Sequence, residues 1–560
     1  MSPRRGRPFW GEGPRLLLPS PFDSHNLNLA FEPRPLGRGF FFAGKGDSLV
    51  MRLRGMVSMF LAGLMLTGGP SVFAGNEPRK LQRVVVCDDN RDPVTLDPFY
   101  ELSEKKHTLI QQIMEGLVRF DANAQVIPVL AERWEQVDPR HLRFFLRKNV
   151  KFHNGEPFDA ESVRFTLQRF IDPATHSPVS GLLSSIEGVK ILDDHTVDIV
   201  TRQPDGLLLR RLAGLVVFVP AKDYVARGPE AFAKNPVGTG PFRMKEWKPN
   251  EEIVLETNRE YWSPSKPNFD ELVMRFLPTA EDQTRELLKG NVDLMTELPG
   301  TYTLRVQENA KTRVIKREAL YTVGGHFNTS LPPFDDVRVR RAVNLALNKE
   351  EFIRYDLLGN GEVVATVCAP GQIGHDPSLQ PYPYDLAKAK ALMAAAGVKT
   401  PVHMDIFLVP FVERPARIIK KQLEAIGIDV EIHVFPEGEA ISAFKSRPWN
   451  LGLTTLPSPI AHVAFPMGLF FYSNSFFSMH HDPVFDRMYE KATSIMDPAE
   501  SEKAFQELER KVYDDALGVF LYRRIKTYAV SKRVRFSPYL TGMPHFVDAV
   551  SLVKEEANKK

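Results

Sequence analysis

Two short segments of this chain contain residue types that hold nucleotides or metal ions in other proteins. Residues 237–242 read Val-Gly-Thr-Gly-Pro-Phe, but they complete no Gly-x-Gly-x-x-Gly pattern, no Walker lysine follows, and Pro241 opposes entry into a helix. His480, His481 and Asp482 stand in a row. Adjacent side chains of an extended segment point to opposite faces, so the two imidazoles are poorly placed to ligate one ion. The sequence therefore predicts neither a phosphate loop nor a metal site, and solvated or loop-capping histidines are expected.

His153 is a third candidate for chemistry, and the elements around it favour a structural role. Leu142, Phe144 and Leu146 alternate with Arg143, Phe145 and Arg147, which is typical of a strand with one buried face. His153 then begins a His-Asn-Gly turn in which Gly155 can adopt a positive φ. Asp159 is placed to cap the helix that follows. We therefore interpret His153 as a turn residue whose hydrogen bonds stay within its own loop.

The chain lacks the sequence signatures of common hydrolases. It contains no Gly-x-Ser-x-Gly elbow, no His-Glu-x-x-His pair and no Cys/His signature. We accordingly predict a protein that is not an enzyme and has no catalytic residues, no metal site and no cofactor.

A secretion signal is predicted inside the chain, at residues 51–74. Residues 51–54 are basic, residues 56–66 form an apolar run too short to span a bilayer, and residues 72–74 read Val-Phe-Ala, a small-x-small cleavage site. The mature protein should begin at Gly75. Residues 1–50 are rich in Arg, Pro, Gly and Phe without periodicity, which is typical of a disordered or non-native leader. Because no lipobox cysteine follows the apolar run, we expect a periplasmic protein without membrane insertion after cleavage.

Composition sets broad limits on partners. The formal net charge of +3 gives no reason to expect nucleic acid binding. Two cysteines, Cys87 and Cys368, are too few for a disulfide scaffold or a cysteine zinc site. The two could pair in an oxidising compartment, but Cys87 lies in an apolar strand and burial as a free thiol is the simpler alternative.

Residues 127–170 carry a longer signature. They contain Pro-x-Leu-Ala-Glu-x-Trp at 128–134, Leu-Arg-Phe-Phe-Leu-Arg at 142–147 and Val-Lys-Phe-His-Asn-Gly-Glu-Pro-Phe at 150–158. This stretch resembles the extracellular solute-binding proteins of family 5, the peptide, opine and nickel receptors of ATP-binding-cassette (ABC) importers. Further matches are Pro-x-Thr-Leu-Asp-Pro at 93–98 and Pro-Phe-Asp-Asp at 333–336.

The resemblance implies an α/β fold, the two-lobed periplasmic binding protein fold of type II, with a hinge and an extra subdomain in the first lobe. It divides the chain into lobe I at 75–324, lobe II at 325–524 and a return to lobe I at 525–560. The pattern of residues 384–434 agrees, since helices predicted to end at Gly397 and Gly427 alternate with a strand at 428–434. Crossings near Gly324 and Tyr522 would form the hinge.

The resemblance also implies ligand-binding residues. Arg414 lies in a Glu-Arg-Pro element similar to the one in which dipeptide receptors hold a ligand carboxylate, and a guanidinium makes two parallel hydrogen bonds to such a group. A surface ion pair is the alternative. The remaining candidates are Tyr100, Gly325, Trp449, Thr455, Leu456 and Ser458. Residues 449–462 lack the aspartate with which peptide receptors bind an α-amino group, so we expect an anionic or neutral ligand, such as a blocked peptide or an opine.

The function implied is that of a periplasmic, monomeric receptor that captures a small solute and delivers it to an ABC permease. The alternatives are a ligand sensor that docks to a signalling partner and a nickel or metallophore receptor. A secreted hydrolase is the least favoured, because no catalytic signature supports it.

Overall fold

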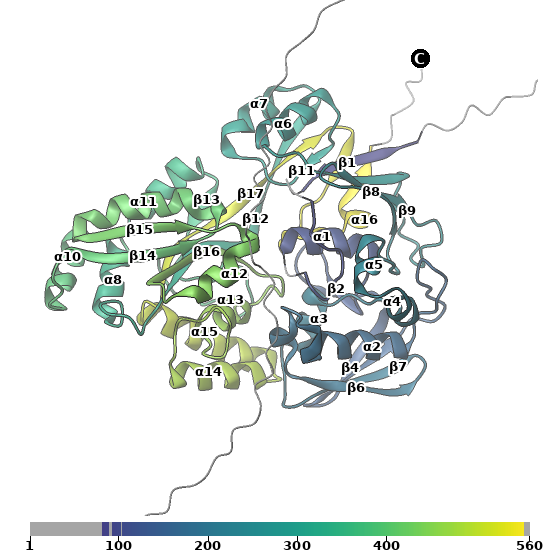
Figure 1. The fold of residues 1–560 in the computed structure, drawn as a ribbon, viewed down its shortest axis with the longest axis horizontal. Helices are drawn as coiled ribbons and strands as arrows, with labels where there is room; N and C mark the ends of the chain where they lie inside the picture. Colours follow the sequence, from purple (N-terminus) through teal and green to yellow (C-terminus); the bar gives the residue numbers. More distant parts are fainter. Residues whose placement is uncertain (1–80, 89–91, 102, 554–560) are drawn as a thin grey trace, which may run out of the picture. The chain divides into compact units, whose positions relative to one another are not determined.

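The structure is a computed structural model that describes residues 81–88, 92–101 and 103–553. The predicted leader and signal peptide lie outside these residues. A single mixed sheet runs through most of the described chain (Figure 1). Its order is β15 (Ile428–Val434), β14 (Val402–Leu408), β16 (Leu451–Pro457), β12 (Thr312–Phe327), β17 (Gly518–Ser531), β11 (Leu294–Met295), β1 (Arg83–Cys87), β10 (Glu271–Arg275), β9 (Glu252–Thr257) and β8 (Phe242–Lys248), and β13 (Gly361–Val363) pairs with β17.

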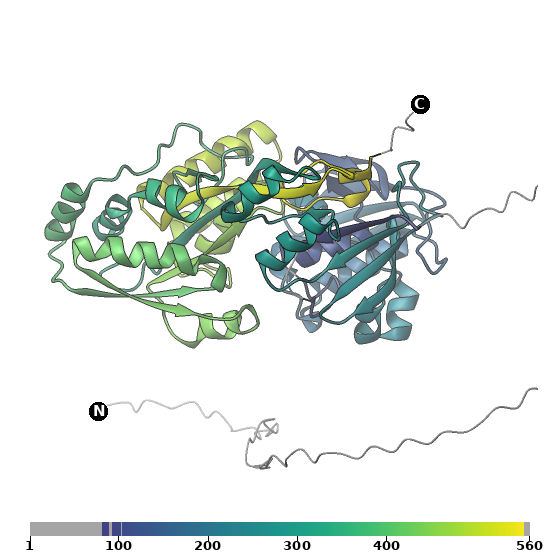
Figure 2. The same ribbon diagram turned by 90° about the horizontal axis from the view of Figure 1, so that it is seen from above.

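Two long strands form the middle of this sheet. β12 has 16 residues and β17 has 14, and they pair antiparallel from Thr312–Ser531 to His326–Gly518. The register shifts between Glu318 and Thr322 and again between Val323 and Gly324. Figure 2 shows the strands of the C-terminal segment, in yellow, reaching both the green and the blue parts of the chain. These are the two crossings expected near Gly324 and Tyr522; their action as a hinge stays a prediction.

Two main hydrophobic cores lie on either side of the crossings. The first is built mainly from residues 84–320 and 528–550, and the second from residues 323–522. We call the segments of the first core lobe I and those of the second core lobe II. The domain boundaries expected at 324 and 524 stay a prediction.

Lobe I contains an additional four-stranded antiparallel sheet. Its order is β4 (Ala131–Asp138), β5 (His141–Leu146), β7 (Thr196–Thr201) and β6 (Ile186–Asp193). Leu142, Phe144 and Leu146 are buried on one face of β5, which confirms the predicted alternation. Helix α2 (Ala160–Ile171) packs on this sheet, and the Asp159 side chain accepts a hydrogen bond from the backbone N–H of Ser162 as expected of an N-cap. Lobe I also contains two two-stranded antiparallel sheets, β2 (Val118–Phe120) with β3 (Val126–Pro128) and β18 (Val534–Phe536) with β19 (Val550–Leu552).

Aspartates begin and glycines follow several helices of lobe II. Asp336 caps α8 (Val337–Ala346), Asp385 caps α10 (Leu386–Ala395), and Gly397 and Gly427, where helix ends were predicted, have positive φ. The α-helix expected to reach Gly427 ends at Leu423, and a 3₁₀ turn covers Glu424–Ile426. The helices of lobe I are α1 (Glu104–Ile113), α3 (Leu208–Leu215), α4 (Ala221–Arg227), α5 (Pro229–Lys234), α6 (Ala280–Lys289), α7 (Thr303–Glu308) and α16 (Phe546–Ala549). Those of lobe II are α8 (Val337–Ala346), α9 (Lys349–Glu351), α10 (Leu386–Ala395), α11 (Glu413–Leu423), α12 (Glu437–Ser446), α13 (Ala464–Phe471), α14 (Pro483–Ser494) and α15 (Pro498–Asp514).

The glycines of the 237–242 segment have a packing role. Gly238 and Gly240 lie against the last residue of α1, where an added Cβ would come within 2.1 and 2.6 Å of the Ile113 carbonyl oxygen. His153 contacts the same segment, because its Nε2 lies 2.9 Å from the Gly240 carbonyl oxygen, and burial lowers its pKa to about 4. The sequence had suggested that His153 forms hydrogen bonds within its own turn. That expectation is wrong in this detail, because the partner of His153 Nε2 lies in the neighbouring 237–242 segment.

Two further expectations concern cysteines and membranes. Cys87 and Cys368 are both buried and free, so the disulfide left open by the sequence does not form. Within the described ranges, no helix is both long and apolar enough to span a bilayer.

Candidate functional site

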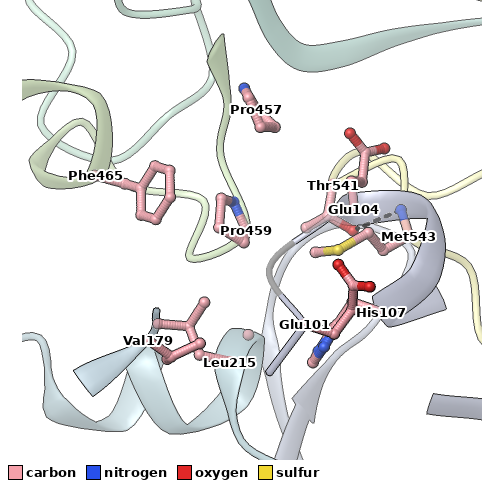
Figure 3. A pocket seen from close by; sticks show the side chains of 11 residues that line it. Glu101, Glu104, His107, Val179, Leu215, Pro457, Pro459, Phe465, Thr541 and Met543 are labelled. Carbon is pink, nitrogen blue, oxygen red and sulfur yellow. Dashed lines mark hydrogen bonds between the residues drawn. The ribbon is translucent and has the colours of Figure 1, made fainter. Parts of the chain in front are cut away.

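A cavity opens where residues of both lobes meet (Figure 3). Its internal volume in this conformation is about 40 Å³, which is room for only a few water molecules. Lobe I provides most of the wall and lobe II provides the end of β16 and the start of α13. The lining residues are Glu101, Glu104, His107, Val179, Gly214, Leu215, Pro457, Pro459, Phe465, Thr541 and Met543.

The polar wall of the cavity comes from the first turn of α1 and the residues before it. Glu104 and His107 are three residues apart and therefore share one face of the helix, and Glu101 lies just upstream. Burial lowers the pKa of His107 to about 4, so its imidazole is neutral at pH 7. Its Nε2 is buried without a hydrogen-bond partner in the described structure. A ligand group that bonded to Nε2 would remove the cost of leaving this atom unsatisfied.

A cluster of charges lies behind Glu104 and fixes its position. The Lys526 ammonium, on β17, is 2.8 Å from the Glu104 carboxylate and 3.5 Å from that of Glu297. Lys105 is 3.5 Å from Glu297 and 3.3 Å from Asp88. Although burial opposes its charge, the two carboxylates raise the pKa of Lys526 well above its usual range. A cation on a crossing strand therefore fixes the position of the Glu104 side chain at the cavity wall.

The wall from lobe II is apolar and rigid. Pro457 ends β16, Pro459 follows it, and the Phe465 ring projects from α13 toward the cavity (Figure 3). Arg210, on α3, donates a hydrogen bond of 2.8 Å to the Ile460 carbonyl oxygen and thereby ties this loop to lobe I. Gly214 permits the contact, since a Cβ there would lie 2.2 Å from the Pro459 carbonyl oxygen.

Comparison with known proteins identifies the family that uses this architecture. The model of the bacterial extracellular solute-binding proteins, family 5 middle region, matches residues 125–494. The chain belongs to this family. The predicted resemblance is confirmed, and with it the assignment as a non-catalytic substrate-binding protein of the ABC importer type.

Individual relatives in the family cover most of the chain. Di/tripeptide-binding protein 2 of Pseudomonas aeruginosa is 28% identical over 392 residues, which are 65% of this chain and 73% of that protein. Heme-binding protein A of Haemophilus influenzae is 26% identical over 464 residues, 76% of this chain and 84% of that protein. The periplasmic binding protein DppA of Helicobacter pylori, solved with the peptide STSA, is 25% identical with a TM-score of 0.76 and covers 84% of this chain and 98% of its own. The predicted α/β fold of the peptide receptors is therefore confirmed.

None of the binding residues inferred from sequence lines the cavity of this family 5 protein, although four of them lie close in sequence to lining residues. Thr455, Leu456 and Ser458 flank Pro457, and Tyr100 precedes Glu101, but none of these candidates is itself a lining residue. Leu456 is buried in a hydrophobic core, and the backbone N–H of His462 donates to the Ser458 hydroxyl. Tyr100 is half exposed, and its hydroxyl accepts a hydrogen bond of 3.3 Å from Arg169.

Gly325 and Trp449 have structural surroundings. A Cβ at Gly325 would lie 2.9 Å from the Gly452 carbonyl oxygen, so the residue allows close pairing of β12 and β16. The Trp449 indole is 2% exposed, donates to the Phe444 carbonyl oxygen at 3.1 Å and packs in a small aromatic core. A direct contact of either residue with ligand stays a prediction.

Arg414 lies in the first turn of α11, which begins just after the carboxyl end of β14. Its side chain is 63% exposed, lies 3.4 Å from the Asp356 carboxylate and donates to the Tyr355 carbonyl oxygen. It is not among the residues that line the cavity. Ligands of open α/β sheets often bind at the carboxyl ends of parallel strands, so its location is compatible with a role in binding, which stays a prediction.

Other histidines singled out in the sequence have local roles. The Asp482 side chain caps α14, and His480 is buried with its Nδ1 2.9 Å from the Thr329 hydroxyl. The residues that sequence reasoning missed are Glu101, Glu104, His107, Phe465, Thr541 and Met543. No local pattern pointed to Glu104, because its partner Lys526 lies on a distant strand.

Proposed function

We propose that this protein captures a peptide-like solute that carries a protonated amino group, closes its lobes on it and delivers it to an ABC permease in the periplasm. The pairing with a permease and the periplasmic location rest on the family and on relatives such as the periplasmic DppA of Helicobacter pylori. The names of the relatives that bind dipeptides and tripeptides support a peptide-like ligand.

The observation that carries the proposal is the charge of the cavity wall. The cavity lining includes two carboxylates, Glu101 and Glu104, and no lysine or arginine. Segment 449–462 lacks the expected acid, but lobe I contributes acids from the opposite side. An ammonium is stabilised here because opposite charges about 4 Å apart attract by about 4 kcal/mol at an effective dielectric constant of 20. Because Glu104 is already paired with Lys526, a ligand ammonium would share its carboxylate with that cation. The lining offers no cation to an anionic group, which reverses the preference expected from sequence.

The remaining walls suit the rest of such a ligand. Phe465, Leu215 and Met543 offer apolar surface for a side chain, while Thr541 and the free Nε2 of His107 offer hydrogen bonds to amide groups. Aromatic and apolar contact supplies affinity, and the few polar atoms fix the orientation of the ligand.

The two strands that cross between the lobes allow the lobes to close on a ligand. Because β12 and β17 belong to both lobes, rotation at their register shifts would bring the Pro457–Phe465 wall toward α1 while the rest of each lobe stays intact. The closed form is favoured only by contacts that the open form lacks, and a ligand that bridges Glu101 and Phe465 provides them.

The test begins with mass spectrometry of the solute released from protein purified out of the periplasm. Calorimetry then compares the released solute with its N-acetylated form. We expect acetylation to weaken binding at least about thirtyfold, a loss of about 2 kcal/mol for a charged partner. Glu101→Gln should weaken the free amine and leave the acetylated form unchanged. Equal affinity for the two forms would refute the amine contact.

Small-angle scattering tests closure separately. Solute at about a hundredfold over its Kd should make the protein more compact and add about 2.7 kcal/mol to the free energy of unfolding. An unchanged radius of gyration at proven saturation would refute closure but leave binding intact.

A further inference from the structure

A second group of polar side chains lies outside the ligand cavity, on one face of the strands at the edge of lobe II. β14 and β15 are parallel neighbours, with Asp405 directly opposite Glu431. His403 lies two residues before Asp405, and His433 lies two residues after Glu431. Side chains two residues apart project from the same face of a strand, so all four share one face. We call these four residues the edge cluster.

The atoms of the edge cluster converge on one another. His403 Nε2 is 3.4 Å from Asp405 Oδ1 and 3.7 Å from Glu431 Oε2. His433 Nε2 is 2.7 Å from Asp405 Oδ1 and 3.6 Å from Glu431 Oε1. One ligand atom from each of His403, Asp405 and Glu431 can be chosen so that all three lie within 4.8 Å of one another. Ligand atoms about 2.0–2.1 Å from a tetrahedral zinc ion lie about 3.3 Å apart, and the observed separations lie on both sides of that value.

The hydrogen bonding of His433 shows that its Nε2 has more neighbours than it can satisfy. The Asp405 carboxylate, 2.7 Å away, requires a proton on this nitrogen, whereas the Arg447 guanidinium, 2.9 Å away, requires a lone pair. Arg447 is also 3.0 Å from the other Asp405 oxygen. One imidazole nitrogen cannot meet both demands, but a cation in place of the guanidinium would be bound by the lone pair and by the carboxylate together.

We propose that the edge cluster binds one divalent transition-metal ion, with zinc as the best fit. His403 Nε2 and one oxygen each of Asp405 and Glu431 supply three ligands, and a small shift of His433, which already lies 2.7 Å from Asp405, brings its Nε2 in as the fourth. Two imidazoles and two carboxylates are a ligand set that suits zinc, and the two carboxylates balance its charge. Arg447 occupies the place of the ion when no metal is bound and swings away when it binds.

This site differs from one for a transported metal. None of its residues lines the cavity between the lobes, and the side chain of His403 is 56% exposed. The ion would link β15, the edge strand of the sheet, to β14. The proposed metal site therefore does not depend on which solute the protein binds, and it can be tested separately.

Calorimetry with ZnCl2 on protein without a histidine tag tests the inference, and Co2+ absorption reports the geometry. We expect one ion per chain and the intense visible bands of tetrahedral cobalt. The double variant His403→Gln/His433→Gln should lose the site. Each single variant should bind at least about tenfold more weakly, since even partners outside the coordination shell alter metal affinity by about 10–100-fold.

Two further variants make the test specific. His141→Gln is the matched control, because His141 lies 2.8 Å from the single carboxylate Asp138 on lobe I and should not affect zinc binding. Arg447→Gln should bind zinc more tightly, because it removes the competing cation. Identical zinc binding by the wild type and the double variant would show an adventitious ion only and would overturn the inference. The inference would also be wrong if the wild type bound no zinc and its melting temperature were the same with and without ZnCl2.

Discussion

The cation behind the cavity provides the sharpest test of the site. Lys526 is 4% exposed at its side chain and touches both Glu104, which is 13% exposed, and Glu297. Lys526→Met replaces the ammonium by a thioether of similar length and leaves Glu104 facing the cavity without its closest cation. We expect the free energy of unfolding to fall and the affinity for an amine-bearing solute to change as well.

The size of the loss follows from burial. Breaking a buried ion pair by removing one partner costs about 3–5 kcal/mol, because a charge is left uncompensated. Lys105 and Arg524 lie close to Glu297 and keep that carboxylate neutralised, so the penalty falls mainly on Glu104. The double variant Lys526→Met/Glu104→Gln removes both charges and should recover most of the loss.

Urea denaturation followed by tryptophan fluorescence measures the two single variants and the double variant. Lys248→Met is the matched control: its ammonium is 3.0 Å from Glu252, but the side chain is 42% exposed and the pair is screened by water, so little change in stability is expected. The reasoning would be wrong if Lys526→Met cost no more than Lys248→Met, or if the double variant lost the sum of the single losses.

Other predictions concern separate parts of the molecule. If Arg414 anchors a ligand carboxylate, Arg414→Ala should weaken solute binding in calorimetry by about 1–2 kcal/mol, whereas Arg417→Ala, from the next turn of α11, should have no effect. Arg210→Ala should weaken solute binding and enlarge the radius of gyration of the bound form, because the loop after β16 loses its tie to α3. Gly238→Ala should lower the free energy of unfolding in urea by about 1–3 kcal/mol through its clash with α1. Burial lowers the pKa of His107 from 6.5 to about 4, so its contribution to stability is present above pH 6.5 and is lost as the pH falls through about 4, which urea titrations at several pH values would show.

Sequence reasoning succeeded where the signal was local. The alternation in β5 and the Asp159 cap each depend on residues within a few positions, and the structure has both. The family motif at 127–170 then identified the fold, since its order and spacing are more specific than any propensity. The sequence was enough to reject a nucleotide-binding loop at Gly238 and Gly240. Only the structure shows why glycine is needed at both positions, which is their close approach to α1.

The binding site was less predictable because it depends on distant pairs. Glu104 is held by Lys526, which is 422 residues away, and no local pattern connects them. The predicted binding residues on either side of Pro457 are close in sequence to the cavity wall. They do not line it, because the alternation along β16 and the turn after this strand direct side chains such as Leu456 and Ser458 into the core. The absence of an acidic residue from residues 449–462 likewise gave no information about Glu101 and Glu104, which lobe I contributes to the cavity.

The interleaving of the chain has a consequence for its biosynthesis. β11 is flanked by β1 on one side and by β17 on the other, and the Gln112 side chain on α1 bonds the backbone of Pro544 and Phe546. Lobe I therefore cannot complete its sheet or its core until the last strands have been synthesised, although its first strand is among the earliest. Such non-local contacts slow folding. Lobe I thus stays incomplete until the chain is nearly full length, which would suit the proposed export, because a translocation channel accepts an unfolded chain.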